Sequence, residues 1–127
     1  MEQRYLIDTN VIIDNFGNKL PENAKNLLYS IDLTLSAVTK IEVLGWINAT
    51  KEQLQPLYEF MDIANILPIN EAVIEKTIAI RQTKKIALGD AIIAATALVY
   101  DLVVISHNTS DFKNIDGLKV IDPYSLP

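Results

Sequence analysis

Residues 88–106 read LGDAIIAATALVYDLVVIS and are the most informative stretch of this 127-residue chain. The first part, Leu88–Tyr100, carries no charged residue after Asp90 and predicts a helix with little solvent exposure. The second part, Leu102–Ser106, is an almost continuous apolar run that favours a β-strand. Such a run is typical of a central strand in a parallel sheet, because helices cover both of its faces. The stretch therefore predicts a buried helix that leads directly into a central strand.

The rest of the chain alternates short β-favouring stretches with helical patterns. Further strands are expected at residues 5–7, 33–36, 66–69 and 119–121. Further helices are expected after Asp8, from Pro21, after Ser36, over 51–61 and from Asn70 towards Lys85. This alternation predicts the α/β class, as a three-layer α/β/α sandwich around a central, mostly parallel sheet of about five strands. We expect residues 1–127 to form a single domain.

Two local patterns predict how particular elements pack. Pro68 cannot donate a hydrogen bond to a neighbouring strand, so the strand over 66–69 is expected at an edge of the sheet. Ile41, Leu44 and Ile47 recur at helical spacing, so they are expected to form the buried face of the third helix.

The composition excludes several classes of site. The chain has no cysteine, which rules out disulfides and thiolate zinc sites, and its single histidine rules out histidine clusters. Eleven Lys and Arg stand against 16 Asp and Glu, and the net charge of −5 disfavours nonspecific DNA binding. No apolar run would span a bilayer and residues 1–4 are not a signal peptide, so we expect a cytoplasmic protein without membrane contact. Only four glycines occur and none forms a phosphate-binding loop, so no organic cofactor is expected.

Four acidic residues are expected at one edge of the sheet. Asp8 directly follows the first strand, Glu42 lies in the first turns after the second, and Asp111 comes just after the central strand. A crossover helix runs antiparallel to the strands, so Asp90, at the start of the buried helix, faces the same edge. Because ligands in such folds bind outside the carboxyl ends of the strands, this edge is the candidate site.

Carboxylates gathered in this way repel one another and raise their own pKa values unless a cation lies between them. Mg²⁺ or Mn²⁺ fits such a site, since both prefer oxygen ligands and share their coordination with water and phosphates. One such ion, or two about 4 Å apart, activates water and stabilises in-line displacement at phosphorus. Bound metal also offsets the acidic field that otherwise repels RNA.

Each acid also has a purely structural interpretation. Asp8 fits a helix cap, Thr39 and Glu42 match a capping box, Asp90 suits the positive end of a helix dipole, and Asp111 fits a turn cap. These interpretations stay open for each residue taken alone. All four acids meeting at one edge is better explained by a shared site.

Four segments together carry a family resemblance. They are residues 6–13 (LIDTNVII), 36–44 (SAVTKIEVL), 88–97 (LGDAIIAATA) and 106–112 (SHNTSDF). In order and spacing they resemble the four acidic motifs of the PIN-domain nucleases, over essentially the whole chain, and the length suits the compact VapC-like toxins. Ser106 and His107 stand where Thr and Arg are more usual in that family.

The resemblance implies a single PIN-like domain that acts as a Mg²⁺-dependent endoribonuclease, the toxin of a type II toxin–antitoxin pair. It implies that the catalytic and metal-binding acids are Asp8, Glu42, Asp90 and Asp111. It further implies that the residues holding these ligands or contacting RNA are Thr9, Asn10, Ser36 and Asn108. Members of the family are usually homodimers, and a protein antitoxin inhibits them by placing its C-terminal segment in the acidic groove.

Some residues near the site keep more than one interpretation. His107 fits a phosphate contact or a solvated loop residue better than a general base, because metal-activated water needs no histidine. The cluster of Arg81, Lys84 and Lys85 fits a phosphate grip or a solvated helix end equally well. Asp14 is expected to face solvent, and Trp46 to lie in the core or an interface.

Two other functions remain as alternatives. A catalytically silent PIN-type module that binds RNA or protein is the first, although such a module has no use for four mutually repelling carboxylates. A phosphatase or nucleotidyl-transfer enzyme on a Rossmann-like sheet is the second. It is disfavoured because the sequence Asp8-Thr9-Asn10 lacks the second aspartate of the aspartyl-phosphate phosphatases.

Overall fold

The computed structural model describes residues 3–126, and within them it contains five short strands. These are β1 (Tyr5–Ile7), β2 (Thr34–Ser36), β3 (Asn65–Leu67), β4 (Val103–Ile105) and β5 (Val120–Ile121). Every strand pairing in this part of the chain is parallel. The α/β class and the mostly parallel arrangement predicted from the sequence are therefore confirmed.

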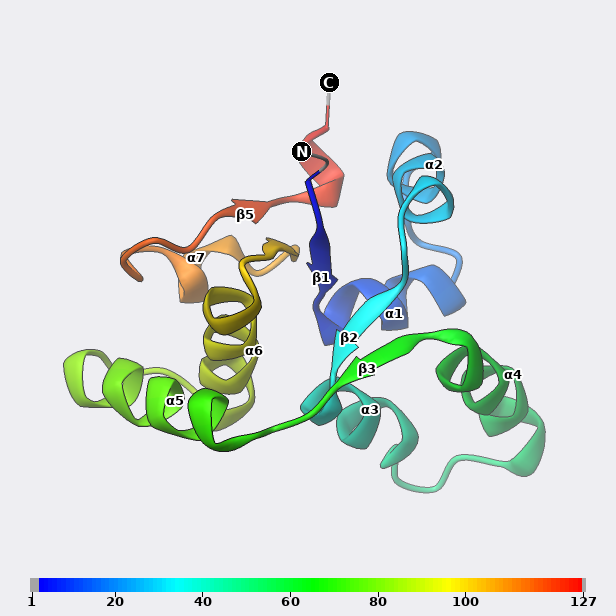
Figure 1. Ribbon diagram of the computed structural model, residues 1–127. Helices are drawn as coiled ribbons and strands as arrows, with labels where there is room; N and C mark the ends of the chain where they lie inside the picture. The colour runs from blue at the N-terminus through cyan, green and yellow to red at the C-terminus, as the bar shows by residue number, and fades with distance from the viewer. Residues whose placement is uncertain (1–2, 127) are drawn as a thin grey trace.

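Hydrogen bonds divide the strands into two groups. One sheet has the order β1-β4-β5, and the other pairs β2 with β3. Strands β1 and β2 lie next to each other (Figure 1), so the five strands form one layer although the ladder is interrupted between these two. Packing joins the two sheets, because Ile7 of β1 and Leu35 of β2 belong to the same core. Strand β3 is an edge strand, as Pro68 predicted.

Two hydrophobic cores lie on opposite faces of the strands. Leu6 and Val104, which are paired across β1 and β4, point into one core, and the next pair, Ile7 and Ile105, points into the other. This alternation follows from the two-residue repeat of a strand, and it makes both faces of the sheet apolar. The result is the three-layer α/β/α arrangement expected from the sequence.

The helices of the described chain fall into two sets around these cores. The core beside Ile7 and Ile105 takes side chains from α1 (Thr9–Phe16), α2 (Glu22–Ser30), α3 (Ala37–Leu44) and α4 (Lys51–Ile63). The core beside Leu6 and Val104 takes them from α5 (Glu71–Thr83), α6 (Leu88–Tyr100) and α7 (Thr109–Phe112). A short 3₁₀ helix, η1 (Pro123–Ser125), follows β5. None of the helices in residues 3–126 is long and apolar enough to cross a bilayer.

The expected buried face of the third helix is wrong for Ile41 and Ile47, whereas Leu44 is half-buried and packs against the core. Helix α3 ends at Leu44, and its buried side chains are Thr39 and Val43, one turn apart. Ile41 is 65% exposed because it lies on the opposite side of this short helix, and Ile47 is 81% exposed because it lies beyond the helix end at Gly45. The spacing of apolar residues alone therefore predicted burial for two side chains that the structure leaves exposed.

Candidate active site

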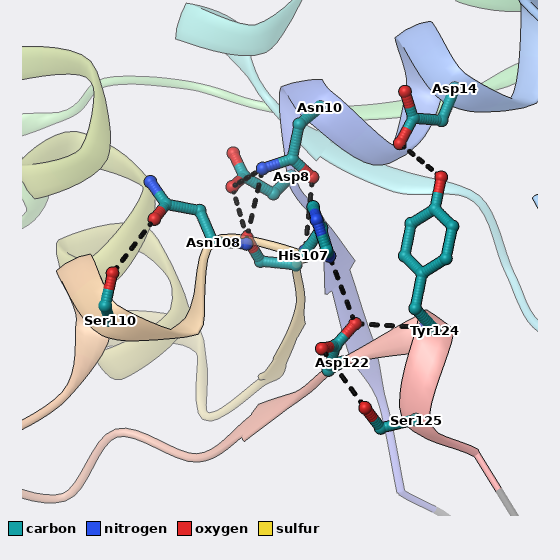
Figure 2. A network of polar contacts seen from close by, with 10 residues as sticks. Asp8, Asn10, Asp14, His107, Asn108, Ser110, Asp122, Tyr124 and Ser125 are labelled. Carbon is teal, nitrogen blue, oxygen red and sulfur yellow. Dashed lines mark hydrogen bonds and ion pairs between the residues drawn. The ribbon is translucent and has the colours of Figure 1, made fainter. Parts of the chain in front are cut away.

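Asp8 is the most enclosed of the four predicted acids. It directly follows β1 and is only 2% exposed. Its carboxylate caps α1 by accepting a hydrogen bond from the Thr9 N–H at 2.7 Å, so the capping interpretation holds. It also accepts hydrogen bonds from the Asn10 amide at 3.2 Å and from the Ser106 hydroxyl at 2.7 Å (Figure 2). A simple cap needs only the first of these, so the carboxylate is also fixed in orientation.

Ser106 connects two of the predicted segments and is a residue that the sequence reasoning left out of the site. It is fully buried at the end of β4. Its hydroxyl donates to Asp8 and accepts from the Asn108 N–H at 2.9 Å and the Asn10 amide at 3.3 Å. The sequence did contain an indication of this role, because Ser106 is the single hydroxyl residue that follows an apolar strand. A hydroxyl buried at such a position must find a hydrogen-bond partner.

Glu42 reaches the site through Thr9. The Thr9 hydroxyl donates to Glu42 Oε1 at 2.7 Å and lies 3.0 Å from the Thr39 hydroxyl. The capping box predicted as an alternative for Thr39 and Glu42 is wrong, because the buried Ser36 caps α3 by accepting a hydrogen bond from the Val38 N–H. Ser36 therefore fixes the start of the helix that carries Glu42.

Helix α6 passes close to Glu42 at Gly89. A Cβ atom at this position would lie 3.0 Å from Glu42 Oε2. The missing side chain lets the Glu42 carboxylate approach the first turn of α6, where Asp90 lies.

Asp111 is exposed and is held by its own segment. The Asn108 amide donates to Asp111 Oδ2 at 2.6 Å, and the buried ring of Phe112 anchors α7 in the core. Lys84 directly follows α5, and its ammonium donates to the backbone carbonyls of Asp111 at 3.2 Å and Lys113 at 2.7 Å. Of the basic cluster Arg81, Lys84 and Lys85, Lys84 therefore stabilises the end of α7 through hydrogen bonds, whereas Arg81 and Lys85 are exposed.

Electrostatics link Asp90 to the other three acids. The pKa of Asp90 is raised from its ordinary value of 3.8 to about 6, first by burial and then by the negative charges of Asp8, Asp111 and Glu42. Burial also raises the pKa of Asp8, against the opposing hydrogen bonds from Ser106 and Thr9. The carboxylates of Asp8, Glu42 and Asp111 are therefore close enough to Asp90 to disfavour its ionisation.

Comparison with known proteins agrees with this geometry. The PIN domain family model matches residues 5–118. The chain belongs to the PIN domain family. No protein of curated function matches it.

Solved structures resemble this PIN domain over nearly its whole length. A toxin–antitoxin complex from Klebsiella pneumoniae contains a chain 36% identical to it, with a TM-score of 0.78 and coverage of 96% of this chain and 99% of that one. FitAcB from Neisseria gonorrhoeae is 30% identical, with a TM-score of 0.76 and the same coverage of both chains. DNA-bound VapBC from Salmonella typhimurium is 25% identical, with a TM-score of 0.82 and again the same coverage. The resemblance to VapC-like proteins predicted from the four segments is confirmed.

The acids of this PIN domain fit Mg²⁺ better than a metal that needs a complete protein cage. Among residues 3–126, no three His, Cys, Asp or Glu side chains are already arranged to enclose an ion. Mg²⁺ does not require this, since proteins usually hold it through one or two carboxylates and leave the other positions to water and phosphates. Hard carboxylate oxygens with raised pKa values are suitable donors for such an ion.

The raised pKa of Asp90 predicts how the free energy of unfolding of the metal-free protein depends on pH. The folded state binds this proton more tightly than the unfolded state, where the pKa returns towards 3.8, so the free energy of unfolding falls as pH rises from about 4 to about 6. A shift of this size corresponds to about 3 kcal/mol in full burial, and solvent screening of the half-buried carboxylate reduces it to about 1–2 kcal/mol. Urea unfolding in EDTA between these pH values measures the change.

Asp90→Asn is the control for this measurement, because the amide has no charge to lose. The difference in unfolding free energy between wild type and Asp90→Asn should grow over the same pH range, with the variant becoming the more stable protein. A difference that stays constant with pH would contradict the assignment of this raised pKa to Asp90.

Proposed function

We propose that this PIN domain is a Mg²⁺-dependent endoribonuclease, with Mn²⁺ as an alternative ion, and the toxin of a type II toxin–antitoxin pair. The observation that carries the proposal is the meeting of carboxylates from four separate segments, in which the charges of Asp8, Glu42 and Asp111 help to raise the pKa of Asp90, on a fold of the PIN family. A structural role would be served equally well by uncharged caps such as Ser36. Carboxylates that gather at the cost of ionising one of them are retained for a ligand that relieves the repulsion.

In this proposal Asp8 and Asp90 are the main metal ligands, and Glu42 and Asp111 complete the acidic edge. A bound divalent cation supplies the positive charge that acidifies water and offsets charge on the phosphate. The chain's own groups set the geometry: Thr9 orients Glu42, Asn108 orients Asp111, and Asn10 orients Asp8. The hydrogen bonds of Asp8 leave it fixed before substrate arrives, and this preorganisation is what favours the transition state.

Cleavage of RNA by the purified chain tests this function. Total cellular RNA should be cut in the presence of Mg²⁺ or Mn²⁺ and remain intact in EDTA. RNA that stays intact with a folded protein that also fails to bind metal would favour the catalytically silent module. Intact RNA with normal metal binding would indicate a narrow substrate that is absent from the RNA tested.

The proposed antitoxin has a suitable groove beside Glu42. The groove has a volume of 620 Å³ and is lined mainly by apolar side chains of α1, α3 and α4, namely Ile13, Phe16, Val43 and Leu57, and by Trp46 beyond the end of α3. Glu42 lies on its wall, and the chain carries a net charge of −5. An amphipathic segment with a basic residue near its end would bury its apolar side chains here and place the cation among the carboxylates.

Trp46 gives a direct measure of that interaction, because it is the only tryptophan in the chain and lines the groove. Its fluorescence emission should shift to shorter wavelength when the antitoxin encoded beside this gene binds. Trp46→Ala should weaken binding on the order of 30-fold, the cost of losing a central aromatic anchor. Tyr29→Ala, at an exposed aromatic on α2, is the control and should bind normally. Equal binding by both variants would contradict the placement.

A homodimer completes the proposal. Exposed apolar side chains occur on α3, on α5 and at the start of α6, and α6 contacts both of the other helices; they are Ile41, Ile74, Ile78 and Leu88. A monomer gains nothing from exposing such a set, whereas a second copy of the chain would bury it.

A further inference from the structure

His107 lies at the edge of the acidic site, next to Asn10. Its backbone N–H donates to Asn10 Oδ1 at 3.2 Å, and the Asn10 amide donates in turn to Asp8. The backbone of His107 is therefore two hydrogen bonds from the most buried carboxylate of the site. Figure 2 shows the imidazole between this group of residues and the C-terminal turn.

Two residues of the C-terminal segment hold the imidazole. The Asp122 carboxylate lies 3.6 Å from His107 Nδ1, and the Tyr124 ring lies against the imidazole with 4.5 Å between centroids and a 58° tilt. Both residues lie beyond the 5–118 range that the family model matches. The residues that contact the imidazole are thus outside the four acidic segments of the sequence.

The two holding residues are themselves fixed. Asp122 accepts hydrogen bonds from the Tyr124 N–H at 2.9 Å and the Ser125 hydroxyl at 3.3 Å. The Tyr124 hydroxyl donates to Asp14 at 2.6 Å, so Asp14 contacts the C-terminal turn and the expectation that it simply faces solvent is wrong. This hydrogen bond raises the pKa of Tyr124 to about 12, which keeps the hydroxyl protonated.

The ring is nevertheless open to solvent. The His107 side chain is 59% exposed, and its Nε2 atom makes no hydrogen bond to any residue in the range 3–126. A side chain that is held on two sides and still exposed loses rotamer freedom without gaining much burial. The Asp122 carboxylate lies beside Nδ1, which leaves Nε2 exposed on a positioned ring and free to donate a hydrogen bond, next to a site rich in carboxylates.

We infer that His107 contacts a backbone phosphate of the RNA next to the cleaved one, and that Asp122 and Tyr124 position it for this contact. The inference rests on the proposed function, because it takes RNA as the ligand. A fixed donor next to four carboxylates gives a polyanion one favourable contact at the rim, and a positioned charge-assisted hydrogen bond to phosphate is among the stronger polar contacts.

Binding without cleavage tests this contact. The probe is a fluorescein-labelled single-stranded RNA of random sequence, and the protein is the Asp90→Asn variant, which holds the substrate without turning it over. Adding His107→Ala should raise the Kd measured by fluorescence anisotropy about tenfold. His107→Gln, which lacks the ring that packs against Tyr124, should lose most of the same affinity, whereas His107→Arg, whose planar guanidinium can lie against that ring and donate to phosphate, should retain it. Asp122→Asn and Tyr124→Phe should each give a smaller loss.

Lys51→Ala is the matched control, because Lys51 is an exposed cation at the start of α4. An unchanged Kd in His107→Ala, or an equal loss in Lys51→Ala, would overturn the contact, and so would the absence of RNA binding. In the active protein, His107→Ala should raise KM and leave kcat nearly unchanged, and a fall confined to kcat would instead support a general base. If wild type binds RNA through His107 but cuts none, the proposed function fails and the contact stands.

Discussion

Asp90→Asn is expected to lower RNA cleavage on the order of 10³-fold and to leave the fold intact. The substitution keeps the shape of the side chain but removes one of the two carboxylates proposed as main metal ligands. Loss of a metal contact removes about 4 kcal/mol of transition-state stabilisation, and each 1.4 kcal/mol corresponds to a factor of ten in rate. Cleavage of a labelled RNA at saturating Mg²⁺ measures the rate, and circular dichroism measures the fold.

Two comparisons separate this effect from a general loss of charge. Asp62→Asn removes an exposed carboxylate from α4 and should cleave at the wild-type rate. Asp90→Asn should also be no less stable than wild type at pH 7 without metal, since it loses a carboxylate whose ionisation is disfavoured in the folded state. An active Asp90→Asn enzyme would contradict the proposed site.

Ser106→Ala is expected to lower the free energy of unfolding by about 2–3 kcal/mol at pH 7. The fully buried hydroxyl donates to the Asp8 carboxylate at 2.7 Å, and a hydrogen bond to a charged group is worth about 1.5–3 kcal/mol. Its loss also leaves the Asn108 N–H without its acceptor. Urea unfolding measures the change, which should be smaller at pH 4 than at pH 7 because the hydroxyl stabilises the charged form of Asp8.

Ser110→Ala is the matched control for this prediction. Ser110 lies in the same segment, and its exposed hydroxyl makes only a long contact of 3.5 Å to Asn108. The control should be within about 0.5 kcal/mol of wild type, and Ser106→Thr should retain most of the stability. Equal losses for the two alanine variants, or a Ser106→Ala loss independent of pH, would contradict the role of the hydroxyl.

The positions of the acids followed from the sequence because they depend on topology alone. Asp8 comes directly after a strand, and Asp90 begins the helix that leads into the central strand, so both reach the same edge in any right-handed parallel arrangement. The bounds of α6 were predictable because thirteen residues with few polar side chains favour a largely buried helix, although Leu88 at its start is exposed.

Other parts of the site depend on contacts that one-dimensional patterns do not contain. The partners of Ser106 come from residues 98 and 96 positions away along the chain. The helix α7 is only four residues long, and it owes its position to buried Phe112 and to Lys84, which directly follows α5. The exposure of Ile41 was missed because spacing identifies an apolar face but not which surface will cover it.

Calorimetric titration with Mn²⁺ tests most directly the claim that the four carboxylates together bind a divalent cation. Wild type should bind Mn²⁺, Asp90→Asn and Asp8→Asn should each bind at least about tenfold more weakly, and Asp62→Asn should bind normally. Added Mn²⁺ should also raise the free energy of unfolding of wild type at pH 7 more than that of Asp90→Asn. Absence of binding by the folded wild type, or equal binding by wild type and Asp90→Asn, would contradict the account.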